Sequence, residues 1–437
     1  MTDIQLSVFS EIDRLRQVLV HRPGPEVDLM VPDMMGDLLF DDILCGDLAR
    51  REHDVFRQVL GRVAEEVLDV QELFEQTLGR EGVKLAFIED LRRLEELPDD
   101  CCNQLRDQPG EVVARSLVTG IPWDDDLVHG NWQKRSFDYR LRPLPNLLFM
   151  RDPAAVLGRS YNVNFMATWA REREPLILSY VFRHHPRLRH LGEGDRLFDQ
   201  ITPLLNRQIR LPQSLEGGDL LVLDQRVLAV GCSERSSADA IHMLAETLRQ
   251  KYRAGESGFE TLLMVLLPKI RSAMHLDTVF TRISAGECLV YPPFFTDHSR
   301  ELLNVVKFDL RGEELATVME ANLLRALRGA GIDLEPVLCG GRNPILQQRE
   351  QWTDGANAFA LAPGVILLYS RNLATCEQLA RAGYRVLHAE QCLGDPAVDL
   401  LDGGKYAVVL DSAELSRARG GPRCMTLPLA RSRPGEV

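Results

Sequence analysis

Residues 217–231 read GGDLLVLDQRVLAVG. A glycine-rich start with one acidic residue leads into two short runs of residues that favour β-structure, and a polar turn separates the runs. Two such runs around a short polar turn are typical of a β-hairpin. We therefore predict a hairpin here that opens on a charged turn.

The same pattern recurs along the chain, which makes it a repeat. The other copies are residues 151–166, 276–292 and 354–370, and a fifth assembled from residues 15–23 and 403–428. Five such units predict an α/β fold in which they are repeated radially and close on themselves. The alternative is a mixed α/β sheet whose hairpins merely look alike.

Several copies lead into a stretch that we expect to be helical. Residues 236–252 begin with two serines suited to N-capping, and residues 313–332 carry apolar side chains at helical spacing with a glycine near the end.

Residues 48–135 interrupt the repeat. Their sequence predicts helices and then an irregular polar stretch that starts at PDDCCNQLRDQPG (98–110). We expect a helical subdomain over 48–135, inserted into the repeated α/β domain of residues 1–47 and 136–437.

The composition limits the possible partners. A chain of 437 residues is longer than one ordinary core, which stops growing at about 250–300 residues. Its formal net charge of −13 argues against nucleic acid or an anionic membrane as the main partner and suits a cationic small molecule. Because we find neither a targeting sequence nor an apolar run long enough to span a membrane, we expect a cytoplasmic protein.

The nine cysteines form neither a CxxC pair nor a Cys/His ligand spacing. The sequence therefore signals neither a disulfide framework nor a zinc site, and we expect most of these cysteines to be buried apolar residues.

The turns that open the copies hold the residues with chemistry. They are Asp152, Glu216, Asp219, His275, Asp277 and Cys424. If the copies surround an axis, these turns converge on it. A thiol with an imidazole would suit a cysteine protease or an acyl transferase, but a cluster of carboxylates suits a planar cation with many N–H donors, such as guanidinium. Taken singly, each aspartate could also cap a turn, and the histidine could be structural.

Two arginines form a second signal. Arg171 and Arg235 each follow the second strand of a copy, so they are expected at the same end of neighbouring units. Two guanidinium groups placed in this way could bind a carboxylate. The alternative is a surface salt bridge of each arginine to a neighbour such as Glu172 or Glu234.

Many separate motifs, in the same order, resemble those of the arginine deiminase family. They are VFSEIDRLRQVLVHRPG, LLFDDI, LPNLLFMRDP, LEGGDLLVL, SERSS, MHLDTVFT, REQWTDGANAFALAPGVILLYSRN and ELSRARGGPRCMTLPLAR. The resemblance implies the pentein fold, a five-bladed pseudosymmetric α/β propeller of ββαβ modules with an inserted helical subdomain. It also implies hydrolysis of L-arginine to L-citrulline and ammonia with no cofactor or metal, in a homo-oligomer that is a dimer or larger.

Residue roles carry over from this resemblance motif by motif. It implies that Cys424 is the nucleophile, His275 the general acid and base, and Asp152 and Asp277 the guanidinium ligands, with Glu216 in support. It places Arg171, Arg235 and Arg419 at the substrate carboxylate, and Asn146 and Phe149 in the pocket lining. Residues 38–43 are candidates for a mobile lid.

The sequence departs from the family pattern at two positions. Ala418 stands where glycine is common and Met150 where threonine is usual, so we expect the loop with Arg419 to sit differently. A hydrolase or amidinotransferase acting on another guanidino substrate, including a dimethylarginine hydrolase, remains an alternative. A catalytically silent protein that only binds its ligand is another.

Overall fold

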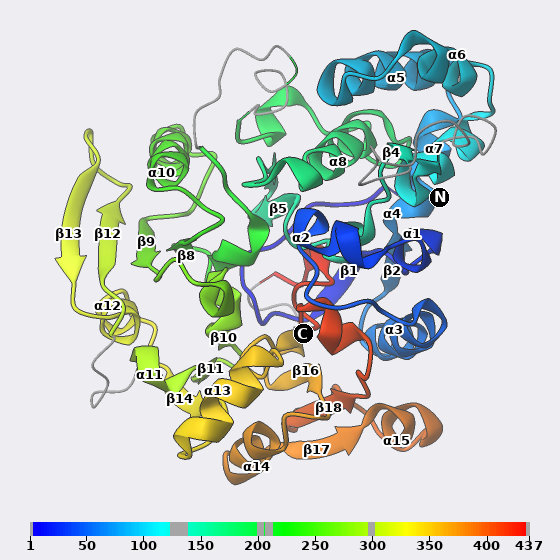
Figure 1. Cartoon of the computed structure of the whole chain (residues 1–437). Coiled ribbons are helices and arrows are strands. Elements are labelled where there is room, and N and C mark those ends of the chain that lie inside the picture. The colour runs from blue at the N-terminus through cyan, green and yellow to red at the C-terminus, as the bar shows by residue number, and fades with distance from the viewer. Residues whose placement is uncertain (1–2, 123–138, 199–204, 206–212, 296–301, 434–437) are drawn as a thin grey trace.

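The computed structural model describes residues 3–122, 139–198, 205, 213–295 and 302–433. Short sheets lie around the middle of the molecule, and most of the helices lie outside them (Figure 1). The fold therefore belongs to the α/β class, as the sequence predicted.

Four predicted copies of the repeat form antiparallel hairpins. The hairpins are β5 (Ala154–Leu157) with β6 (Ser160–Val163), β7 (Leu220–Val222) with β8 (Val227–Cys232), β10 (Phe280–Arg282) with β11 (Glu287–Val290), and β15 (Phe359–Ala362) with β16 (Val365–Tyr369). Three of them gain a parallel strand beside the second strand of the hairpin. These strands are β9 (Thr261–Leu266), β14 (Glu335–Leu338) and β18 (Tyr406–Leu410). A parallel neighbour requires a crossover connection, which here contains at least one helix each time.

The chain ends form a further sheet, but not with the strand that the sequence indicated. Strand β1 (Leu15–Val20) pairs antiparallel with β19 (Leu427–Arg431) and parallel with β2 (Glu66–Asp69). Strand β18, which lies inside residues 403–428, pairs instead with β16 and with β17 (Arg385–His388). The fifth copy is therefore assembled from both chain ends, but the expectation that β18 belongs to it was wrong. The local pattern does not show which buried run is the hairpin strand and which is the parallel strand.

The prediction of one helix over residues 313–332 was also wrong. Strand β13 (Ala316–Glu320) pairs with β12 (Val305–Asp309) at the edge of the sheet β13-β12-β9-β8-β7, and only α12 (Leu323–Gly329) is helical. Asn322 starts this helix, because its side chain accepts a hydrogen bond from Arg325 N at 2.8 Å. The apolar spacing of residues 316–320 is compatible with a helix, but these residues form a strand because all five pair with residues of β12.

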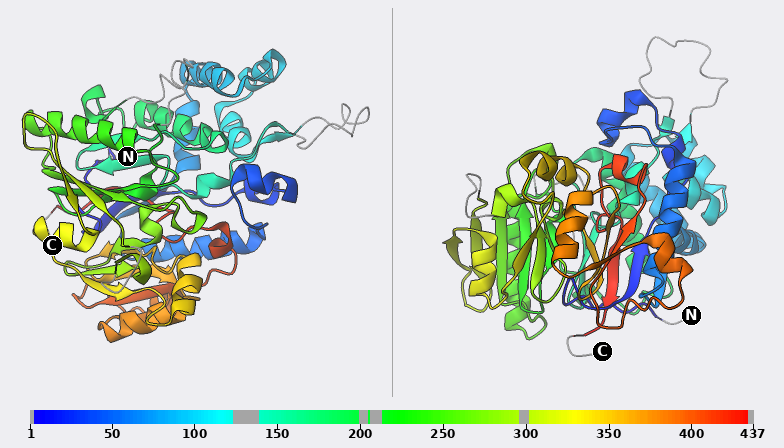
Figure 2. Two further views of the ribbon diagram at one scale, coloured as in Figure 1. Left: turned by 60° about the vertical axis from the view of Figure 1, so that its left-hand side comes forward. Right: turned by 90° about the horizontal axis from the view of Figure 1, so that it is seen from below.

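Residues 48–122 are mainly helical. The helices are α3 (Gly46–Leu60), α4 (Val70–Leu78), α5 (Glu81–Glu95), α6 (Asp99–Arg106) and α7 (Gly110–Thr119), and α5 and α6 lie at the outer edge of the molecule in both views (Figures 1 and 2). Strand β2 is an exception within this range. The prediction of an irregular stretch from residue 98 was wrong for α6. This helix forms because Cys101, Cys102 and Leu105 are buried on one face, and Lys84 Nζ donates to Arg106 O at 2.9 Å near its end. The end of the predicted insertion, residues 123–135, lies outside the described residues.

Helix α10 (Ala238–Arg253) starts as predicted, because the side chain of Ser237 accepts from Ala240 N. The other described elements are α1 (Pro25–Asp28), α2 (Met35–Leu38), β3 (Ile121–Pro122), β4 (Tyr139–Leu141), α8 (Arg173–His184), α11 (Pro292–Phe295), α13 (Pro344–Trp352), α14 (Leu373–Arg381) and α15 (Ala389–Gly394). None of the described helices is both long and apolar enough to cross a membrane. Apolar side chains fill the spaces between sheets and helices; Val18, Phe56 and Leu367 belong to one such cluster.

Candidate active site

The turns that open the hairpins meet in one buried region. Asp152 precedes β5, a 3₁₀ turn at Gly217–Asp219 follows Glu216, and a second at Leu276–Thr278 follows His275 and contains Asp277. Cys424 comes just before β19. The convergence that we inferred from the repeat is therefore present, because each turn stands at the same end of its hairpin.

Eight of the ten predicted site residues line one pocket. They are Asn146, Phe149, Asp152, Arg171, Arg235, His275, Arg419 and Cys424. Glu216 and Asp277 lie behind this lining and are fully buried. Arg271 also lines the pocket, and it was not predicted.

Cys424 is 5% exposed, and its Sγ lies 3.8 Å from Asp277 Oδ2. Burial raises the pKa of its thiol well above the usual value, and the charges of Asp277 and Asp152 raise it further. A β-carbon on Gly420 would lie 2.3 Å from the Phe149 ring and 3.1 Å from Cys424 Cβ. Only glycine therefore lets this loop approach Phe149. Because the pKa of its thiol is raised, Cys424 is protonated in the absence of a ligand.

The His275 imidazole lies between two carboxylates. Its Nε2 is 2.9 Å from Glu216 Oε2, and its Nδ1 is 3.9 Å from Asp152 Oδ1. Burial lowers the pKa of this imidazole, but Asp152 and Glu216 outweigh that effect and raise the pKa to about 9. His275 is therefore a cation at neutral pH and can donate a proton.

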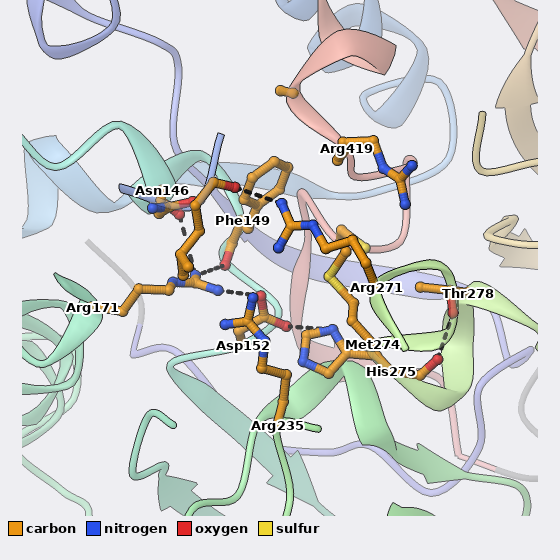
Figure 3. Close-up of a pocket in the computed structure, with 13 residues that line it drawn as sticks. Asn146, Phe149, Asp152, Arg171, Arg235, Arg271, Met274, His275, Thr278 and Arg419 are labelled. Carbon is orange, nitrogen blue, oxygen red and sulfur yellow. Dashed lines mark hydrogen bonds and ion pairs between the residues drawn. The ribbon is translucent and has the colours of Figure 1, made fainter. Parts of the chain in front are cut away.

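Asp152 binds Arg171 directly, and Figure 3 shows it between Arg171 and His275. Arg171 Nη1 donates to Asp152 Oδ2 at 2.6 Å, and Arg171 Nε and Nη2 donate to Glu174 at 3.0 and 2.7 Å. Arg171 is 3% exposed, so the alternative of a surface salt bridge to Glu172 was wrong. The partner on helix α8 is Glu174, three residues further on.

Arg235 and Arg419 have N–H groups to spare. Among the described residues, Arg235 Nε and Arg419 Nε and Nη1 are buried without a hydrogen-bond partner. Arg235 lies 3.9 Å from Glu216 and is 4% exposed, so it is not a surface arginine paired with Glu234. These donors can receive an anionic group of a ligand.

The structure shows the surroundings of the two residues that depart from the family pattern, Ala418 and Met150. Ala418 ends a 3₁₀ turn at Leu415–Ala418, and the left-handed residue is Arg419, with φ of 66°. Met150 is fully buried in an apolar cluster and does not line the pocket. Position 418 therefore does not require the left-handed conformation that favours glycine, and the expectation that the Arg419 loop sits differently stays a prediction.

A metal would have to compete with cations that are already present. One oxygen each of Asp152 and Glu216 and one nitrogen of His275 lie within 4.8 Å of one another. Arg171 Nη1 is 2.6 Å from Asp152 and 4.0 Å from Glu216, and His275 carries a proton. The arrangement suits a guanidinium group, whose N–H donors match several carboxylate oxygens.

Sequence comparison identifies the family. The sequence profile described as arginine deiminase matches residues 36–431. The chain belongs to the arginine deiminase family. It is 35% identical over 448 residues to an arginine deiminase from Clostridium perfringens and 34% identical over 435 residues to one from Listeria welshimeri. Each alignment covers 98% of both chains.

Two solved structures resemble this arginine deiminase family member at lower sequence identity. A complex of AgrE with ornithine and NAD+ is 16% identical with a TM-score of 0.49, and the match covers 97% of this chain and 40% of that one. A dimethylarginine dimethylaminohydrolase adduct is 14% identical with a TM-score of 0.47, and the match covers 94% and 99% of the two chains.

Besides Arg271, four charged residues near the site were missed by the sequence analysis. They are Glu11, Glu174, Asp354 and Arg423. The i, i+3 spacing from Arg171 could have indicated Glu174, and the position of Asp354 in the opening turn of the fourth copy could have indicated that residue. Burial raises the pKa of Asp354 to about 7. Nothing local to Glu11 indicates its place.

Asp219, in contrast, has a structural place. Its carboxylate accepts from Leu276 N at 2.8 Å and from Ser233 Oγ at 2.7 Å, and it does not line the pocket. It therefore fixes the backbone next to His275.

Proposed function

We propose that this protein hydrolyses L-arginine to L-citrulline and ammonia through a covalent amidino-cysteine intermediate. The observation that carries the proposal is the meeting of Cys424, His275 and Asp152 in one pocket of a chain that belongs to the arginine deiminase family. A thiol, a protonated imidazole and carboxylates together match a cationic substrate with a leaving nitrogen.

Binding precedes chemistry. Asp152 and Asp277 accept hydrogen bonds from the guanidinium of the substrate, and Asp277 Oδ1 has no other partner among the described residues. Arg235 and Arg419 donate to the substrate carboxylate. Arg171 joins them after the substrate guanidinium replaces Arg171 Nη1 at Asp152. Asn146 and Phe149 line the channel, and Asn146 Nδ2 donates to Leu38 O at 2.6 Å.

The arriving cation prepares the nucleophile. A positive charge beside Cys424 lowers the pKa of the thiol, which releases its proton to solvent. The resulting thiolate attacks the guanidinium carbon. His275 gives its proton to the departing nitrogen, and ammonia leaves. The carbon is now bonded to sulfur as an amidino-thioether.

Hydrolysis reverses the role of His275. The neutral imidazole takes one proton from a water molecule, whose oxygen attacks the same carbon. The carbon–sulfur bond breaks, the second water proton passes to solvent, and citrulline and the thiolate are released. Glu216, 2.9 Å from His275 Nε2, keeps the ring in position through both steps.

The first experiment is an assay of citrulline and ammonia released from L-arginine, with Cys424→Ala as the control. We expect equal amounts of both products from the wild type and none from the variant. Adding glycine tests the alternative of amidino transfer, because transfer would form ornithine. A folded wild-type protein that forms neither citrulline nor ornithine would contradict the proposal.

We also infer that five ββαβ units surround one axis as in a pentein propeller, and that the helices within residues 48–135 form an inserted subdomain. Four sheets that join an antiparallel hairpin to a parallel strand support this inference, together with the hairpin β5-β6. The parallel bridge between Tyr161 and Arg196 stands where that hairpin would receive its third strand.

We propose a cytoplasmic homo-oligomer, a dimer or larger. All nine cysteines are free, as suits a reducing compartment. Light scattering of the purified protein would test the oligomeric state.

A further inference from the structure

A buried ion-pair chain lies directly behind Asp277. Arg423, which is 1% exposed, donates from Nη1 to Asp277 Oδ2 at 2.7 Å. Its other side binds Glu11, with Nε 2.9 Å from Oε2 and Nη2 3.1 Å from Oε1. Arg423 thus joins a carboxylate of the site to a carboxylate that does not line the pocket.

This geometry fixes the orientation of the Asp277 carboxylate. Because Arg423 occupies Oδ2, the other oxygen, Oδ1, remains without a partner among the described residues. Arg423 cannot rotate freely, because its Nη2 also donates to Leu220 O at 2.7 Å. One carboxylate oxygen of Asp277 is therefore held, and the other is left for a ligand.

The charges in this chain matter as well as the geometry. Arg423 alone would cancel the negative charge of Asp277, which a cationic ligand needs. Glu11 is 8% exposed and is surrounded by the buried guanidinium groups of Arg423, Arg151 and Arg431. Its carboxylate restores one net negative charge to the set of Glu11, Arg423 and Asp277.

We propose that Glu11 and Arg423 are positioning residues that hold Asp277 in the orientation and charge state needed to bind the guanidinium group. This inference rests on the proposed function. Arg423 directs one oxygen of Asp277 to the substrate, and Glu11 offsets the charge of Arg423. Neither side chain touches the substrate in this proposal, because Arg423 lies behind Asp277 with Nε, Nη1 and Nη2 all engaged, and Glu11 lies behind Arg423.

If Glu11 offsets the charge of Arg423, Glu11→Gln should have opposite effects on the rates at which a cationic and a neutral reagent alkylate Cys424. The variant removes the negative charge of Glu11, so Arg423 and Asp277 remain as an ion pair with no net charge beside Cys424. Cationic 2-chloroacetamidine should then alkylate Cys424 more slowly, because Asp277 attracts it less. Neutral iodoacetamide should react faster, because the loss of this negative charge lowers the pKa of the thiol.

The experiment measures both alkylation rates at pH 7 in the wild type, in Glu11→Gln and in Glu66→Gln. Glu66 is a matched control, because it forms a bidentate pair with Arg187 at 2.7 Å and does not line the pocket. We expect the ratio of the amidine rate to the iodoacetamide rate to fall roughly tenfold in Glu11→Gln and to stay unchanged in Glu66→Gln. The value of kcat/KM for arginine should fall with the amidine rate.

Rates that change together, or a ratio equal to that of the control, would overturn the proposal, because a merely loosened site affects both reagents alike. If Glu11→Gln does not fold, Arg423→Lys replaces it: lysine keeps the charge but cannot bind Glu11, Leu220 O and Asp277 together. The amidine rate should then fall more than the iodoacetamide rate, and equal falls would contradict the idea. Alkylation needs no turnover, so a wild type without citrulline release refutes only the proposed function.

Discussion

The glycine at position 218 offers a direct test of how tightly His275 must be held. A β-carbon on Gly218 would lie 2.6 Å from His275 Nδ1 and 2.7 Å from its Cγ. Ordinary contact begins near 3.4 Å, so Gly218→Ala leaves the imidazole about 0.8 Å too close. The backbone at Gly218 is not left-handed, so the steric contact alone makes glycine necessary.

The ring has little room to move away. Its Nε2 is 2.9 Å from Glu216 on the side opposite Gly218, and Asp152 Oδ1 would be 3.1 Å from the new methyl group. A shift of nearly 1 Å therefore disturbs the hydrogen bond to Glu216 and misdirects the proton of His275. Misplacement of this size costs about 100-fold in rate, while overpacking costs about 1–3 kcal/mol of stability.

The assay is kcat for citrulline formation in Gly218→Ala, with thermal unfolding measured in parallel. Gly286→Ala is the matched control, because its β-carbon would meet nothing within 4 Å in the turn between β10 and β11. We expect a loss of kcat of about 100-fold in Gly218→Ala only. A folded Gly218→Ala protein with the kcat of the control would refute the claim that this spacing positions His275.

Three further predictions concern binding, stability and the lid. Asp277→Asn should lower kcat/KM for arginine at least about 100-fold, since it removes a charge that faces the guanidinium; an unchanged value would remove Asp277 from the site. Burial lowers the pKa of His21, but Asp69 and Glu26 outweigh burial and raise it to about 9 from 6.5. Protonated His21 therefore stabilises the folded state fully below pH 6.5, and this contribution is lost as the pH rises to 9. His21→Gln should reduce the change in unfolding free energy between pH 6 and pH 9.5 by about 3 kcal/mol, measured by urea unfolding at both pH values. Residues 38–43 contact the site through Leu39 O, which accepts a hydrogen bond from Arg271 at 2.8 Å. Added L-arginine should therefore protect these residues from proteolysis in Cys424→Ala, and equal cleavage with and without L-arginine would argue against a lid.

The sequence predicted eight of the residues that line the pocket, because the repeat and the residues with chemistry coincide. Asp152, His275 and Cys424 stand in equivalent opening turns, and a turn before a β-hairpin is a local feature that glycine and acidic residues indicate. Helix α10 could be predicted equally well, because its N-cap serine and the spacing of its apolar residues are local features. These features depend on neighbours within a few residues, so the sequence alone determines them.

Local pattern failed where two elements compete for the same residues. Residues 316–320 have the apolar spacing of a helix but form the edge strand β13, because β12 supplies backbone partners. Strand β18 looked like part of the fifth unit, and only its pairing with β16 assigns it to the fourth. Strand pairing joins distant residues, and a single sequence holds no record of which distant strand is adjacent.

The sequence by itself determined the hairpin units, the turn residues Asp152, His275 and Cys424, and the family. Only the tertiary structure decided their electrostatic setting: Arg171 is held by Glu174, and Asp277 is held by Arg423, which binds Glu11 at a separation of 412 residues. The physical reason is that a buried charge takes whichever opposite charge folding brings within about 3 Å, and that choice depends on packing and desolvation of the whole molecule.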